Sequence, residues 1–150
     1  MSLRRHFTLA TAGIAMTWLA AAGVSQVAQA AEVMMVMATL SAAQEVPPNP
    51  STGTGELTGQ FDPTTHTLSY QVTYSGLTGP VKMGHFHGPA PLGQNAGVAV
   101  PFAPPLDSPI KGTVVLTTEQ EMALLAGHWY VNLHTAENPK GEVRGQVMAH

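Results

Sequence analysis

Two histidines flank one aromatic residue in the segment Met83-Gly84-His85-Phe86-His87-Gly88-Pro89. Side chains alternate across a β-strand, so a strand here points His85 and His87 to one face and Phe86 to the other. Phe86 can then enter a hydrophobic core, while the two imidazoles lie side by side on the opposite face with Met83. Gly88-Pro89 is typical of a strand end, because proline cannot donate to a sheet ladder. The segment therefore predicts a strand whose two faces carry different chemistry.

A related pattern lies further along the chain, in the segment His128-Trp129-Tyr130-Val131-Asn132-Leu133-His134. With the period of two that a strand imposes, its apolar residues face inward and its polar residues face the opposite way. We expect the two strands to bring His85, His87 and His134 together on one face. His128 lies roughly 20 Å from His134 along such a strand, at ~3.3 Å per residue, and is not expected to join them.

Other short strand-like segments follow one another along the chain, with Gly- and Pro-containing turns between them. All the expected strands cover residues 33–41, 52–61, 66–75, 81–87, 98–102, 110–116, 128–134 and 142–148. One short helix is expected near 118–126, with Thr118 as N-cap, Glu121 completing a capping box and Gly127 at its end. About eight short strands with such turns predict an all-β fold, an antiparallel β-sandwich with Greek-key connections. A closed barrel is the alternative.

Residues 1–30 have the pattern of a cleaved signal peptide. Arg4-Arg5 gives a positive start, an apolar run extends from Phe7 to Val24, and Ala28-Gln29-Ala30 supplies small residues before a cleavage site. Polar residues interrupt the run, which argues against a membrane anchor. The paired arginines also fit twin-arginine export, so the Sec and Tat routes both stay open. We expect cleavage after Ala30, one mature domain of residues 31–150 without a membrane span, and a periplasmic or extracellular location.

The expected mature domain is acidic, with four basic residues against nine acidic residues and a formal charge of −5 when histidine is neutral. Such a domain offers no basic surface to nucleic acid or anionic lipid. The chain contains no cysteine, which excludes thiolate metal sites and cysteine-based catalysis. It also lacks a Gly-x-Ser-x-Gly motif and a phosphate loop, so the sequence indicates no catalytic residue.

Three neutral imidazoles suit copper or zinc, and three histidine ligands leave one coordination position open. Met83 could add a thioether from the same face, which favours Cu(I). The alternative interpretation is structural. His85 and His87 would then bond the backbone of the following loop, and His134 would cap the turn at Asn138-Pro139.

Asn132 and Arg144 are expected behind the metal ligands, as groups that orient them. For Arg144, an ion pair with Glu142 on an exposed strand face is the favoured interpretation. The alternative is a cation that attracts an anion or fixes a loop. Asn132 could equally satisfy the backbone of a loop. A run of methionines at Met34, Met35 and Met37 is interpreted as packing residues rather than a copper-gathering tract.

Several longer segments occur together and in one order. They are Ala38-Thr39-Leu40-Ser41-Ala42-Ala43-Gln44-Glu45-Val46-Pro47-Pro48, Leu68-Ser69-Tyr70, Tyr74-Ser75-Gly76-Leu77, His85-Phe86-His87-Gly88-Pro89-Ala90, Trp129-Tyr130-Val131-Asn132-Leu133-His134-Thr135 and Asn138-Pro139-Lys140-Gly141-Glu142-Val143-Arg144-Gly145-Gln146. Together they resemble the CHRD domain, named after chordin, an extracellular antagonist of bone morphogenetic proteins. The resemblance covers nearly all of residues 31–150 and implies an extracytoplasmic β-sandwich. It implies no particular activity.

A weaker similarity connects the chain to the Cu,Zn superoxide dismutase sandwich. That family also uses a His-x-His strand, a later histidine and an arginine near the C-terminus, and the matching residues here are His85, His87, His134 and Arg144. The sequence departs from the family in having no cysteine pair and no histidine in the loop of residues 88–97. The similarity concerns fold and ligand type, which do not fix function.

The sequence therefore favours an exported metal-binding protein for metal buffering or resistance, with copper preferred to zinc. Two alternatives come from other functional classes. One is a non-catalytic module of the cell envelope that holds a protein or a glycan. The other is a copper-only enzyme similar to superoxide dismutase.

Overall fold

The computed structural model describes residues 32–150, and the expected signal peptide of residues 1–30 lies outside this range. Nine strands form one hydrogen-bonded sheet with the order β5-β4-β7-β8-β1-β2-β3-β6, and β9 pairs with β1. The strands are β1 (Met34–Ser41), β2 (Thr54–Asp62), β3 (Thr67–Ser75), β4 (Met83–His87), β5 (Val98–Pro101), β6 (Ile110–Val115), β7 (Tyr130–His134), β8 (Val143–Gln146) and β9 (Met148–Ala149). A 3-10 turn, η1 (Ala42–Gln44), and one helix, α1 (Thr118–Leu125), complete the described elements.

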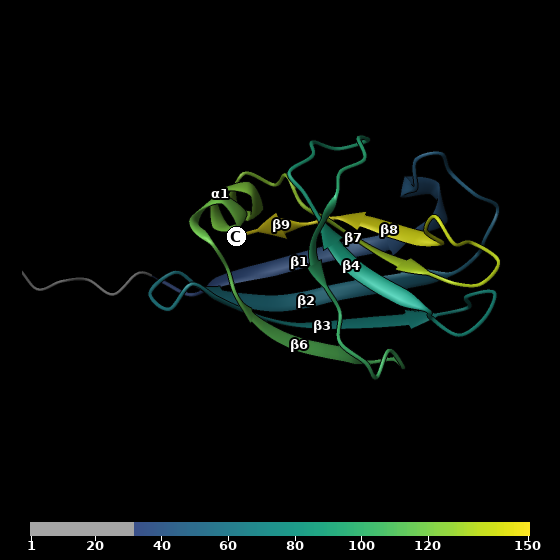
Figure 1. Ribbon diagram of the computed structural model, residues 1–150, viewed down its shortest axis with the longest axis horizontal. Coiled ribbons are helices and arrows are strands. Elements are labelled where there is room, and N and C mark those ends of the chain that lie inside the picture. The colour runs from purple at the N-terminus through teal and green to yellow at the C-terminus, as the bar shows by residue number, and fades with distance from the viewer. Residues whose placement is uncertain (1–31) are drawn as a thin grey trace, which may run out of the picture.

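The sheet curls strongly, so that its two halves pack face to face around one core. Figure 1 shows β4, β7 and β8 lying across β1, β2 and β3. Tyr70 of β3 meets Phe86 of β4 edge to face, with ring centroids 5.0 Å apart, although these strands lie near opposite ends of the sheet order. Phe86 also packs against Phe102 and Trp129. The aromatic cluster fills the interior that the curled sheet encloses.

The all-β antiparallel class and the single short helix are confirmed. The expected two-layer packing arises within one continuous curled sheet rather than from two separate sheets. The expected strand 142–148 is divided at Val147 into β8 and β9, which pair with different parts of β1. Four neighbouring pairs, β3–β6, β4–β7, β8–β1 and β9–β1, join strands distant in the sequence.

The helix begins one residue earlier than the capping pattern predicted. Thr117, not Thr118, is the N-cap, and Gln120 rather than Glu121 completes the capping box. Both pairs have the required spacing of three, so the sequence alone could not separate them. Gly127, with φ of 69°, follows the C-cap as expected. In residues 32–150 no helix is long and apolar enough to cross a membrane.

A buried carboxylate at the end of β7 accepts hydrogen bonds from three loops, the ones that contain Ser51, Thr78 and Thr135. Glu142 accepts hydrogen bonds from Ser51 Oγ (2.6 Å), from Thr78 N and Oγ1 (both 2.7 Å), and from Thr135 Oγ1 (2.5 Å). Burial opposes ionisation of Glu142, but these hydrogen bonds outweigh it and lower its pKa to about 2. Thr135 follows the last residue of β7 directly, so the charged form of Glu142 fixes the chain next to His134.

The substitution Glu142→Gln is expected to destabilise the fold at neutral pH by a free energy on the order of 3 kcal/mol. The folded pKa lies below the ordinary value of 4.5, so the ionised carboxylate stabilises the protein above that pH. This stabilisation is lost as the pH falls toward 2. Urea unfolding measured between pH 7 and pH 2.5 should therefore show a difference in the free energy of unfolding between Glu142→Gln and the unmodified protein. This difference should shrink as the pH approaches 2.5.

The exposed residue Glu56 supplies a matched control, because Glu56→Gln changes the same group on a solvated strand. Its unfolding curve should follow that of the unmodified protein within about 0.5 kcal/mol. A Glu142→Gln protein as stable as this control would show that the carboxylate charge does not hold the three loops.

Candidate metal centre

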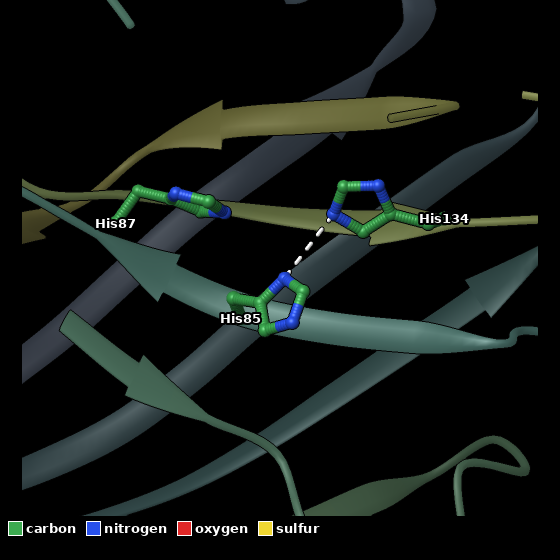
Figure 2. Close-up of side chains that lie close together, drawn as sticks. All are labelled: His85, His87 and His134. Atoms are coloured by element: carbon green, nitrogen blue, oxygen red, sulfur yellow. Dashed lines mark hydrogen bonds between the residues drawn. The ribbon is translucent and has the colours of Figure 1, made fainter. Parts of the chain in front are cut away.

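Antiparallel pairing of β4 with β7 gathers the three histidines on the outer face of the sheet. Met83 pairs with His134, His85 with Asn132 and His87 with Tyr130, while Phe86 and Val131 point into the core. The two strands therefore present His85, His87 and His134 to one point, as the alternation of side chains predicts. One ligand atom from each ring lies within 4.8 Å of the others, and Figure 2 shows the three rings converging.

Backbone carbonyls set the orientation of two of the rings. His134 Nδ1 lies 3.1 Å from the carbonyl oxygen of Pro139, and His87 Nδ1 lies 3.0 Å from that of Ala96. A carbonyl oxygen can only accept, so Nδ1 of His87 carries the hydrogen and donates it. The neutral His87 ring consequently has its lone pair on Nε2, the nitrogen remote from the loop. A neutral His134 ring has one N–H but two acceptors beside it, the Pro139 carbonyl at Nδ1 and Asn132 Oδ1 at Nε2 (3.0 Å), and donation to Pro139 is the tautomer that leaves Nε2 able to bind a metal. A carbonyl behind the imidazole is the usual arrangement for a histidine that binds a metal.

The atom that most directly indicates a ligand is His87 Nε2. This nitrogen is buried and has no hydrogen-bond partner among the described residues. A buried lone pair without a partner is costly, and a bound cation would satisfy it. His85 Nδ1 lies 3.2 Å from His134 Nε2. Two nitrogens that share one metal at ~2.0–2.1 Å in tetrahedral geometry lie about 3.3 Å apart, close to this separation.

Electrostatics keep the imidazoles in the form that binds metal. Burial is the largest cause that lowers the pKa of His85, and the neighbouring His134 and His87 lower it further, to about 4. Burial also lowers the pKa of His134, although its bond to Pro139 works in the opposite direction. At neutral pH both rings are therefore neutral, with a lone pair free for coordination.

Two further predicted residues lie around the triad. Met83 is on the same face of β4 as His85, directly opposite His134, and its side chain is half exposed. Asn132 is buried, and its Oδ1 lies 3.0 Å from His134 Nε2. Met83 thus lies at the edge of the site and Asn132 behind it. His128 is exposed and is not part of the triad, as expected.

Arg144 lies behind His87 rather than on an exposed face. Its guanidinium is 3.5 Å from the centre of the Tyr130 ring, and that ring stacks on His87 with centroids 4.8 Å apart and planes 1° from parallel. Arg144 Nη1 donates to Asn95 Oδ1 (2.9 Å) and Nη2 donates to the carbonyl of Gln94 (2.6 Å). The side chain is 1% exposed.

The favoured ion pair between Arg144 and Glu142 is therefore wrong. The carboxylate of Glu142 accepts from hydroxyl and backbone groups instead, and no salt bridge between the two residues is present within residues 32–150. The alternative, in which Arg144 fixes a loop, describes what the structure shows. The guanidinium holds residues Gln94 and Asn95, which lie beside the carbonyl that orients His87.

Tyr130 and Glu45 are neighbours of the site that the sequence did not single out for a role. Tyr130 OH accepts a hydrogen bond from the amide of Ala96 (3.2 Å) and donates one to its carbonyl (3.3 Å). Tyr130 therefore holds Ala96, whose carbonyl orients His87. The period-two pattern put Tyr130 on the same face as the histidines, and this was the sequence signal that could have indicated its role at the site. Glu45 is 6% exposed, and burial raises its pKa to about 7 against the opposing effects of Arg144 and Asn132.

Comparison with known proteins identifies the domain but not its activity. A family model for the CHRD domain matches residues 36–147, nearly the whole of the described chain. No curated protein and no solved structure matches the chain. The match includes both histidine strands and the residues that orient them. The chain belongs to the CHRD domain family.

Proposed function

We propose that this CHRD-domain protein is an exported metal-binding protein whose His85, His87 and His134 hold one copper ion. The observation that carries the proposal is the buried Nε2 of His87, which has no hydrogen-bond partner within residues 32–150 and lies close to two other imidazoles. Three neutral nitrogen ligands with a fourth position open suit storage and exchange of a metal. Metal buffering or resistance is the function that such a site supports.

Copper is preferred to zinc for two chemical reasons. Nitrogen ligands bind Cu²⁺ more tightly than Zn²⁺ in the general order of divalent metals. The thioether of Met83, opposite His134 at the edge of the site, adds a soft group that suits Cu(I). Zinc is the second candidate, because three imidazoles also form common zinc sites.

An exported location agrees with this chemistry. The pattern of residues 1–30 predicts secretion, and a chain without cysteine needs no disulfide in an oxidising compartment. We place the protein in the periplasm or outside the cell, where copper is handled without the cytosolic thiol pool.

The alternatives receive different degrees of support. A superoxide dismutase-like enzyme needs a cation that draws an anion toward the metal, but the guanidinium of Arg144 is buried and bonded to Gln94 and Asn95. One feature of the structure favours a non-catalytic envelope module. A hollow of about 300 Å³ lies between the Pro47-Pro48 and Pro139-Lys140 loops. Partner binding that persists in the presence of a chelator would favour that module.

Copper titration of the protein and its histidine variants tests the proposed site. We expect one equivalent of copper at sub-micromolar affinity, and at least about hundredfold weaker binding in His85→Ala and in His87→Ala, because each removes a ligand. Competition titrations with Cu(I), Cu(II) and Zn(II), together with elemental analysis, give both the affinity and the preferred metal.

His128→Ala is the matched control, since this exposed histidine lies outside the triad, and it should bind copper like the unmodified protein. His85 is the more informative variant, because its ring contacts His134 but holds no loop. Unchanged affinity in both triad variants would mean that the triad is not a copper site and that His87 and His134 serve to fix the loops at Ala96 and Pro139.

Arg144→Lys tests whether the guanidinium positions His87. Lysine keeps the charge but cannot bond Gln94 and Asn95 with a planar fork while lying over Tyr130. We expect copper affinity to fall roughly tenfold, and amide hydrogen exchange to accelerate in residues 88–97.

Lys111→Arg provides the reciprocal control on an exposed strand position and should change neither quantity. Exchange and affinity that both stay unchanged in Arg144→Lys would show that the loop does not need the guanidinium to hold His87 in place.

A further inference from the structure

A second group of side chains of the types that bind soft metal ions lies on β1, on β9 and just after β9, away from the three histidines. Met37 of β1 pairs directly with Met148 of β9. The next pair on the same face is Met35 with His150, whose backbones exchange two hydrogen bonds of 2.8 Å. Side chains directly opposite each other in an antiparallel pair have Cβ atoms about 5 Å apart, and residues two apart share a face. Met37, Met148 and His150 are therefore neighbours on one face.

This face is the solvent side of the sheet. Met37 is 43% exposed and Met148 is 48% exposed, whereas the alternate residues Val36 and Val147 are completely buried. The side chains of Met37, Met148 and His150 line one hollow of about 380 Å³, with Glu56 on its wall. Two exposed thioethers and an imidazole thus border the same space.

The methionine run at residues 34–37 divides between two roles. Met34 packs against the core, as expected. The packing interpretation is wrong for Met35 and Met37, whose side chains are exposed. Met35 is exposed, but its sulfur accepts a hydrogen bond from Gln60 Nε2 (3.9 Å) on the β2 side, away from β9. Met37 alone faces Met148. The candidate group therefore consists of Met37, Met148 and His150.

We propose that Met37, Met148 and His150 form a second metal site, selective for soft monovalent ions of the Cu(I) type. Thioether sulfur binds Cu(I) and similar soft ions but is a poor ligand for Zn²⁺ or Ca²⁺. Unbranched methionine side chains adapt readily, so two that lie opposite each other can converge on one ion. The imidazole of His150 completes a three-coordinate group, and the carboxylate of Glu56 adds favourable charge at the wall.

This site goes beyond the proposed copper function of the histidine triad and does not depend on it. The triad is formed by β4 and β7, while Met37 is on β1, Met148 is on β9 and His150 follows β9 directly. The ligand sets also differ, since the triad is wholly nitrogen and the second site is largely sulfur. Either site can therefore be removed without altering the ligands of the other.

Silver titration in chloride-free buffer tests the proposal, because Ag(I) imitates Cu(I) without redox chemistry. Native mass spectrometry counts the bound ions, and methionine ε-methyl NMR signals identify the ligands. We expect Met37→Leu/Met148→Leu to lose one equivalent of Ag(I), or to bind it at least tenfold more weakly. The signals of Met37 and Met148 should shift on titration of the unmodified protein. Leucine preserves the volume of methionine, so the fold is retained.

Met122→Leu is the matched control, because Met122 is an exposed methionine on α1, and this variant should keep all bound Ag(I). His85→Ala/His87→Ala should keep the equivalent that Met37→Leu/Met148→Leu loses, which separates the two sites. A double methionine variant that binds as many Ag(I) ions, with the same affinity, as Met122→Leu would overturn the proposal. So would ε-methyl signals of Met37 and Met148 that do not move.

Discussion

The pairing of β4 with β7 is the constraint on which the site depends, and the aromatic core fixes that pairing. Phe86 packs against Tyr70, Phe102 and Trp129 inside the curled sheet. Because successive side chains point to opposite faces, a slip of one residue would expose Phe86 and bury the histidines in the core. The hydrophobic effect that places one ring inside therefore places two imidazoles outside, in a register that brings them to His134. The arrangement of the histidines on the outer face therefore follows from the packing of the aromatic core.

The strands position the histidines, and the neighbouring loops orient two of their rings. The outer face of a sheet would normally leave imidazoles in water, but here backbone carbonyls of Ala96 and Pro139 receive their Nδ1 hydrogens. The loop that carries Ala96 is held in turn by Arg144 and Tyr130, and both residues stack behind His87. The lone pair of His87 is consequently on Nε2, and that of His134 is on Nε2 in the tautomer that donates to Pro139. The orientation of these two candidate ligands thus depends on residues that lie behind them, as is common in metal sites.

The sequence predicted the strands of the site well and its loops poorly, for a physical reason. Alternation within residues 83–87 and 128–134 is a local property, so the face of each histidine could be read directly. The role of Arg144 depends on a loop some fifty residues earlier in the chain, and no local pattern reports its burial. The same limit applies to the pairing of Met37 with Met148, which required knowing that the last strand divides at Val147 and returns to β1. The capping box was displaced by one residue because two overlapping pairs satisfied one rule.

Two buried carboxylates near the site behave in opposite ways, and the difference lies in their donors. Glu142 receives four hydrogen bonds and stays ionised with a pKa of about 2. Glu45 has an oxygen without a partner among the described residues, and burial raises its pKa to about 7. A side chain on Gly141 would collide with Glu45 and Asn132, so glycine is what allows these two groups to approach. Asn132 in turn contacts His134. Glu142 therefore holds the end of β7 in place through a fixed charge. Asn132 separates Glu45 from the candidate ligand His134. Because the pKa of Glu45 is about 7, its protonated and ionised forms are both populated at neutral pH.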